Sequence, residues 1–94
     1  MYDRIKIRVE IFKEDDRYVS FCPELNVSSY GDTPEDAKES LKEAVSLFLE
    51  ECKRMGTLED VLEEAGFKHR VKPHDEWLTP HPLAIEEIDI RTVS

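Results

Sequence analysis

The spacing of the apolar residues changes abruptly within the first half of the chain, and this change constrains the fold more than any other feature of the sequence. Up to that point β-branched residues stand at every second position, which predicts a half-buried strand over residues 4–13. Beyond it, from Ala37 on, apolar residues recur every three or four positions, which is typical of an amphipathic helix. The chain is therefore expected to be an α+β protein. The alternating residues are Ile5, Ile7, Val9 and Ile11.

Two more strands are expected before the helix. Residues 13–17 form a charged run of turn character, and the aromatic and β-branched residues 18–22 after it predict the second strand of a hairpin. Pro23 cannot donate a ladder hydrogen bond and ends that strand. Residues 26–30 supply a third short strand, and Gly31 gives the chain freedom to turn out of it. The result is a three-stranded antiparallel β-meander.

A strong helix start follows the third strand. Thr33 can cap free backbone N–H groups, Pro34 fits the first helical position, and two acids come next, at the positive end of the helix dipole. The helix is expected to continue to about Arg54 and to cover the apolar face of the meander with one stripe. The stripe consists of Ala37, Leu41, Ala44, Val45, Phe48 and Cys52.

The pattern weakens beyond the long helix. Thr57 begins a second capping pattern, which predicts a short helix over residues 58–65 that ends before Gly66. The next stretch is punctuated by three prolines and is expected to be irregular. A last strand is predicted over residues 84–92, because apolar and charged residues alternate there. It should pair at a sheet edge or with a second subunit.

The length of 94 residues allows one modest hydrophobic core, so residues 1–94 are expected to be a single domain. Its core is placed at residues 3–66 and a C-terminal extension at residues 67–94. No apolar run approaches the roughly 18 residues of a membrane span, and the start lacks the apolar block of a secretory signal. A cytoplasmic location is expected. Cys22 and Cys52 form no CxxC pair and are expected to be reduced.

The charge balance narrows the choice of partner. Twenty-two acidic against thirteen basic residues give a formal charge of -9, which repels a phosphate backbone, so direct nucleic-acid binding by this domain alone is not expected. The same field would speed encounter with a basic protein. Solubility alone explains the acidity equally well.

Two groups of residues are candidate metal sites. Carboxylates at strand ends could bind a divalent cation for phosphodiester cleavage, and histidines with nearby acids could bind a transition metal. Solvated turns and a helix N-terminus explain the carboxylates, and the histidine spacing fits neither a helical pair nor a zinc finger. No catalytic residue, metal or cofactor is expected. The groups are Glu10, Asp15, Asp16, Glu24 and Asp32, and His69, His74, His81, Asp75 and Glu76.

Binding of a partner protein is the remaining function class. Trp77 is the only tryptophan, and it either anchors a contact with a partner or covers the domain's own core, with the second slightly favoured. A small open meander also has unpaired strand edges, which a partner's strand or a second copy can complete. A dimer is therefore expected.

These segments together resemble the HicB-like family. The similarity rests on the strand and turn Tyr18-Val19-Ser20-Phe21-Cys22-Pro23-Glu24-Leu25, on Ser29-Tyr30-Gly31-Asp32-Thr33-Pro34-Glu35-Asp36-Ala37, and on a helix ending Leu47-Phe48-Leu49-Glu50-Glu51. It covers roughly residues 3–53.

The resemblance implies a truncated RNase H-like fold without nuclease activity. It also implies an antitoxin of a type II toxin–antitoxin pair, in which HicB neutralises HicA, a small basic ribonuclease. Family members often carry an additional DNA-binding domain, but residues 67–94 are too short and proline-rich for a helix-turn-helix. Asn26-Val27 also stands where many relatives have Pro-Gly. The alternative is a stand-alone dimeric protein-interaction or regulatory module without a toxin partner.

For partner contact the sequence favours exposed acids and a few apolar anchors. Asp15 and Asp16 lie in the predicted hairpin turn, and Glu24 lies in the Cys-Pro-Glu-Leu turn. Tyr30 is a candidate apolar anchor, as is Trp77.

Overall fold

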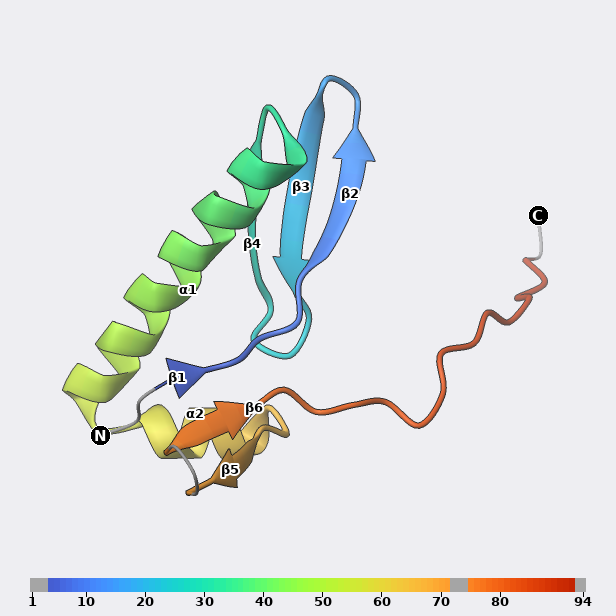
Figure 1. Cartoon of the computed structure of the whole chain (residues 1–94). Coiled ribbons are helices and arrows are strands. Elements are labelled where there is room, and N and C mark those ends of the chain that lie inside the picture. Colours follow the sequence, from blue (N-terminus) through green and yellow to red (C-terminus); the bar gives the residue numbers. More distant parts are fainter. Residues whose placement is uncertain (1–3, 72–74, 93–94) are drawn as a thin grey trace.

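The chain forms an α+β structure built from two small sheets and two helices, as expected. The computed structural model describes residues 4–71 and 75–92, and over these ranges it contains two three-stranded sheets, a long helix and a short one (Figure 1). Within the same ranges, neither helix combines the length and apolar character needed to cross a bilayer.

The larger sheet is the predicted antiparallel meander. It consists of β2 (Glu10–Glu14), β3 (Arg17–Cys22) and β4 (Val27–Gly31), paired in chain order. Glu14 lies opposite Arg17, so the first hairpin turns over the two residues between them. The three-stranded prediction is confirmed for this sheet.

The single strand predicted over residues 4–13 is wrong, because that stretch is divided between the two sheets. Its start is β1 (Arg4–Ile5), which pairs in parallel with a strand near the other end of the chain. The backbone N–H of Lys6 continues this contact with a 2.9 Å hydrogen bond to the carbonyl of Trp77. Alternation shows which side chains face a core, but it does not show which strand supplies the hydrogen bonds.

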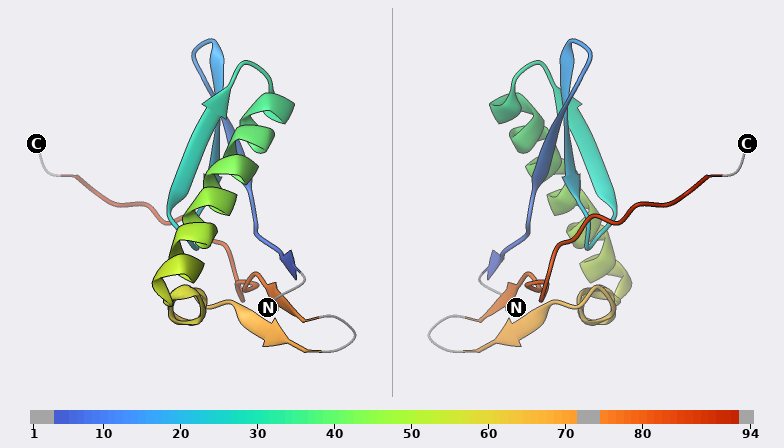
Figure 2. Two further views of the ribbon diagram at one scale, coloured as in Figure 1. Left: turned by 90° about the vertical axis from the view of Figure 1, so that its left-hand side faces the viewer. Right: turned by 90° about the vertical axis from the view of Figure 1, so that its right-hand side faces the viewer.

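The long helix α1 (Pro34–Met55) begins and ends as its sequence predicts. Thr33 accepts a 3.0 Å hydrogen bond from the N–H of Asp36, and Gly56, at φ 75°, closes the other end. The helix lies across one face of the β2–β3–β4 sheet, over β4 and β3 (Figure 2). Phe48 is the most exposed member of the predicted stripe, at 36%. The buried members are Ala37, Leu41, Val45 and Cys52.

The first turn of α1 is held against the sheet at backbone distance. The buried Ser20 hydroxyl donates a 2.6 Å hydrogen bond to the carbonyl of Ala37. A Cβ atom on Gly31 would lie 2.5 Å from the backbone N of Ala37 and 2.7 Å from the carbonyl carbon of Asp36. Glycine is therefore required here by the close approach of the helix.

The second layer contains α2 (Leu58–Glu64) and the sheet β1–β6–β5 (Figure 1). The predicted short helix is confirmed, and Gly66 follows it at φ 89°. The predicted cap is wrong: Thr57 makes no side-chain cap, and its hydroxyl instead donates a 3.3 Å hydrogen bond to the carbonyl of Cys52.

The irregular stretch expected after α2 contains a hairpin instead. Its strands are β5 (Lys68–Arg70) and β6 (Glu76–Leu78), which pair antiparallel. The first of these is entirely basic or histidine, so it carries no apolar alternation that would indicate a strand. The hairpin forms because Trp77 of β6 is buried in a second core cluster. That cluster consists of Leu62, Phe67 and Trp77.

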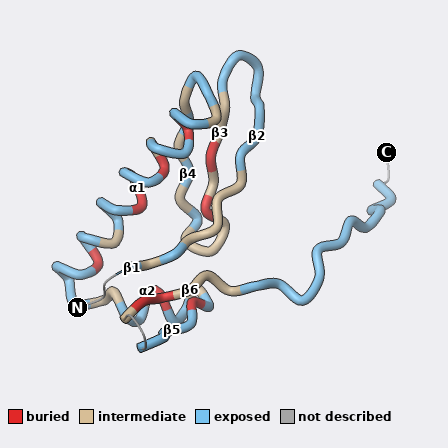
Figure 3. The backbone as a smooth tube through the Cα atoms, in the orientation of Figure 1, coloured by how far each residue is buried: buried red, intermediate tan, exposed pale blue. Residues whose placement is uncertain are grey.

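The strand predicted over residues 84–92 is also wrong. Residues 79–92, called the C-terminal arm below, contain no helix or strand, and they leave the body of the protein in an extended path (Figures 1 and 2). Beyond Pro80 every described residue of the arm is exposed (Figure 3). Apolar and charged residues alternate in this segment as in a strand, but no strand of the described chain pairs with it.

We expect Gly31→Ala to destabilise the fold by about 1–3 kcal/mol, because the added methyl group overpacks a backbone contact that cannot easily widen. Urea denaturation followed by circular dichroism measures this loss. Ser28→Ala, an exposed change in the same strand, should stay within about 0.5 kcal/mol of the parent. Equal stability of the two variants would contradict the close approach of α1 to β4.

Candidate protein-binding surfaces

Two acidic turns meet at one end of the larger sheet. The turn between β2 and β3 and the turn between β4 and α1 both lie at the upper end in Figure 1. The strand register agrees, because Tyr18 lies opposite Gly31 and each turn follows within a few residues of this pair. We call the six exposed carboxylates of these turns the acidic end: Glu14, Asp15, Asp16, Asp32, Glu35 and Asp36.

Each part of the acidic end also has a local reason to be acidic. Asp15 adopts a left-handed backbone conformation at φ 54°, which aspartate tolerates better than most residues. Glu35 and Asp36 occupy the first turn of α1, where negative charge complements the helix dipole. These roles leave the carboxylates at the surface, so they remain accessible to a partner.

The sheet face opposite α1 is apolar and partly open. The register places Val19 opposite both Phe12 and Tyr30, and since Ser20 points to α1, these neighbours of opposite parity point away from it. Tyr30 is 56% exposed, and the Arg17 guanidinium lies over its ring at 3.8 Å from the centroid. We call this the outer sheet face: Phe12, Val19, Phe21 and Tyr30.

Glu24 does not join the acidic end. It lies in the turn between β3 and β4, at the opposite end of the sheet, and its side chain is 8% exposed. The Arg8 guanidinium donates a 2.5 Å hydrogen bond to its carboxylate. Of the residues that the sequence favours for partner contact, the structure therefore groups Asp15 and Asp16 with Tyr30 nearby, and separates Glu24.

Trp77 lies inside the protein, in agreement with the core alternative. It is 3% exposed and packs with Leu62 and Phe67. The ring of His69, on the neighbouring strand, stacks on its indole with centroids 4.7 Å apart and planes 10° apart. The residue thus holds the small sheet against α2.

A buried carboxylate ties the three strands of the small sheet together. Glu76 on the central strand lies opposite Arg4 on β1 and Arg70 on β5, and it forms ion pairs with both. Burial alone would raise the pKa of the Glu76 carboxyl, but the hydrogen bond and charge of Arg70, with attraction from Lys6 and Arg4, lower that pKa below the ordinary glutamate value.

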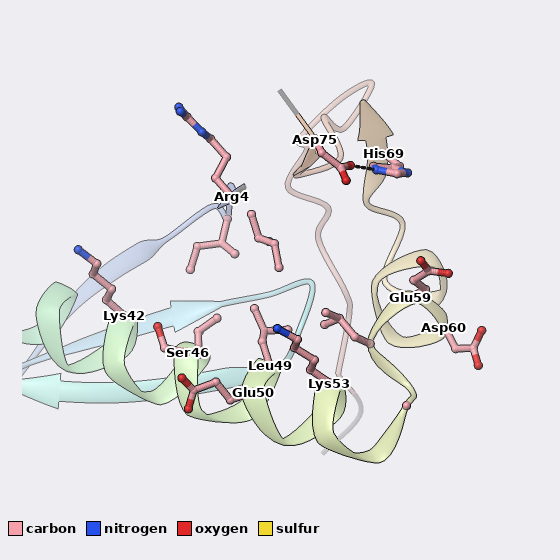
Figure 4. A pocket seen from close by; sticks show the side chains of 15 residues that line it. Arg4, Lys42, Ser46, Leu49, Glu50, Lys53, Glu59, Asp60, His69 and Asp75 are labelled. Atoms are coloured by element: carbon pink, nitrogen blue, oxygen red, sulfur yellow. Dashed lines mark hydrogen bonds and ion pairs between the residues drawn. The ribbon is translucent and has the colours of Figure 1, made fainter. Parts of the chain in front are cut away.

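A groove of about 950 Å³ separates α1 from β1 and α2 (Figure 4). Its apolar lining comes from three elements and includes Ile5, Val45 and Leu58. Charges of both signs stand around it, among them Lys53 of α1 and the ion pair of His69 with Asp75, which Figure 4 marks. Mixed charge gives the groove no preference for a cation or an anion.

The structure provides no metal site over residues 4–71 and 75–92, where no group of three or more His, Cys, Asp or Glu side chains could hold an ion. His74 lies outside the described residues. Cys22 and Cys52 are buried free thiols, as expected. Burial raises the pKa of the Cys22 thiol, so the reactive thiolate is disfavoured.

Comparisons with protein-family models, with curated proteins and with solved structures found no match. The case for a function therefore rests on the residues and their arrangement. The sequence groups Asp32 with Asp15 and Asp16 only as a candidate metal site, which the helix start at Thr33 explains more simply, and not as part of a partner-binding surface. The antiparallel order of the strands predicts that Asp32 lies near Asp15 and Asp16, because alternate turns of a meander lie at the same end of the sheet.

We expect Glu76→Gln to lower stability at neutral pH and to weaken its pH dependence. The pKa of Glu76 is lower in the folded chain than in the unfolded one, so its stabilising effect is complete above the unfolded pKa. That effect is lost as pH falls below about 5 towards the folded pKa. Thermal melts between pH 7 and pH 3 measure the change. Glu63→Gln, an exposed change, should keep the parent profile; parallel profiles for parent and Glu76→Gln would count against the Glu76 cluster.

Proposed function

We propose that this chain is a non-catalytic, antitoxin-like protein that binds and neutralises a small basic ribonuclease of the HicA type. The observation that carries the proposal is the acidic end, where six exposed carboxylates from two turns stand beside the partly open outer sheet face. The resemblance of residues 3–53 to HicB-like antitoxins supports the same partner class.

Electrostatics explains how such a partner would be attracted. The net charge of -9 speeds encounter with a basic protein at low ionic strength, and the acidic end provides a concentrated target for lysine and arginine side chains. Tyr30 lies nearby on β4, the edge strand away from β2, and adds exposed apolar area, which a charged surface alone lacks. This combination of an apolar centre and a charged rim is common in protein–protein interfaces.

Neutralisation needs no chemical step. A ribonuclease of this kind must present basic side chains to the phosphates of RNA. A row of carboxylates that occupies those side chains competes directly with the substrate. The proposed role of the acidic end is thus to cover the toxin's RNA-binding surface.

The second candidate function is a stand-alone dimeric protein-interaction module. The C-terminal arm favours it, because its large apolar side chains are exposed and available for contact between copies. The two candidates differ in the partner that they require, so a binding experiment separates them.

Asp15→Asn with Asp16→Asn and Asp32→Asn should weaken binding of a small basic HicA-type ribonuclease by roughly tenfold or more, because three charges leave the interface. Asparagine tolerates the left-handed conformation of Asp15, so the fold should be kept. Calorimetric titration at low and moderate salt measures the affinity and its salt dependence.

The matched control removes equal charge elsewhere. Glu59→Gln with Glu63→Gln and Glu64→Gln changes three exposed carboxylates of α2, far from the acidic end, and should leave the affinity within about twofold. Equal losses in both variants would mean that only net charge matters. No complex with the parent protein would remove the antitoxin proposal.

A further inference from the structure

The four most exposed large apolar side chains of the described chain all lie in the C-terminal arm. Leu83, Ile85, Ile88 and Ile90 are each at least 73% exposed. The arm also makes the molecule unusually long: the radius of gyration is 15.8 Å, against about 12 Å for a compact chain of this size. Apolar side chains placed at this density on an extended segment indicate a contact that one copy of the chain does not supply.

The start of the arm is fixed and directed away from its own sheets. Pro80 lies against the end of α2, where a Cβ atom on Gly66 would be 3.6 Å from the proline ring. Pro80 and Pro82 fix their own backbone angles and hold the preceding residues extended. The stretch between them therefore acts as a stiff spacer. In all views the arm projects from the body (Figures 1 and 2).

The edge of β2 is the complementary open surface. β2 is hydrogen-bonded to β3 on one side only, and its residues are the most exposed of the larger sheet. The other edge strand, β4, lies beneath α1, whereas α1 barely reaches β2. A free edge with unpaired backbone groups accepts an added strand.

The side chains determine which face of an added strand would lie on which side of the sheet. On β2, Glu10 and Glu14 point to the same side as Phe12, and Lys13 points to the opposite side. On the arm, apolar residues alternate with acids from residue 87 onward. Placing the acids beside Lys13 and the isoleucines beside Phe12 avoids like charges across the strands, which destabilise a sheet. The arm residues in question are Glu87, Ile88, Asp89 and Ile90.

We propose that the C-terminal arm is an exchanged strand: residues 86–92 of one copy add to the free edge of β2 in a second copy, and the second copy returns the same contact. The exchange buries Ile88 and Ile90 against Phe12 and extends the larger sheet by one strand in each copy. Reciprocal exchange gives a closed, two-fold dimer. This inference is independent of the antitoxin proposal, because it requires no partner of another kind, and it gives the contact between copies on which the second candidate function rests.

Light scattering on the full chain tests the exchange. The parent should show twice its chain mass of 11.0 kDa, and Ile88→Ser with Ile90→Ser should return it to a single chain mass while the helical circular-dichroism signal is kept. The arm makes no strand or helix of its own, so these changes cannot unfold it. Leu47→Ser with Met55→Ser, an equal loss of exposed apolar residues on α1, should remain dimeric.

Hydrogen exchange locates the contact. The β2 amides that point to the free edge should be protected in the parent and lose at least tenfold protection in the arm variant, while those of β3 stay unchanged. A parent that is monomeric at every concentration overturns the proposal, as does a dimer that survives the arm substitutions. Protection of these free-edge amides in a monomer would show the arm on its own sheet and also overturn the proposal. No toxin is present, so failure here leaves the proposed function to its own titration.

Discussion

The contact between the first turn of α1 and the strands β3 and β4 determines most of the structure. Ser20 donates its hydroxyl proton to the carbonyl of Ala37, and Gly31 lets the helix backbone approach without a side chain between them. This contact fixes which face of the sheet is covered, and so leaves the outer sheet face open. It also draws the turn that contains Asp32 to the same end as the hairpin turn at Asp15. The candidate surface is a consequence of how the helix is docked.

The acidic end shows how local structural needs can assemble a binding surface. A helix start favours carboxylates near its free N–H groups, and a tight hairpin turn favours aspartate in a left-handed conformation. Neither need refers to a partner. Because the meander returns its turns to alternate ends, these two sets of charges meet, and their combined field exceeds what either turn would provide.

Local pattern was enough to predict the meander, both helices and the cap at Thr33, since each depends on neighbours within a few residues. It failed where pairing is distant: the run after Arg4 was predicted as one strand, yet its start pairs with β6. The β5–β6 hairpin was missed because Lys68-His69-Arg70 carries no apolar period, and its stability comes from burial of Trp77. Within the candidate site, Asp15, Asp16 and Tyr30 could be chosen by type, but Glu24 could not be excluded before its ion pair with Arg8 was seen.

The parallel pairing of β1 with β6 has a consequence for the order of folding. It joins Arg4 to Glu76, so this sheet cannot close until residues near both extremes of the described chain are present. The strands of the meander pair with one another within residues 10–31, and α1 packs mainly on β4 and β3, so these elements can form earlier, during synthesis, while the later segment is still emerging. Until then Ile5 and Leu62 lack their shared core. The β1–β6–β5 sheet therefore forms last. Until it forms, the apolar residues that pack against Leu62, Phe67 and Trp77 are exposed to solvent.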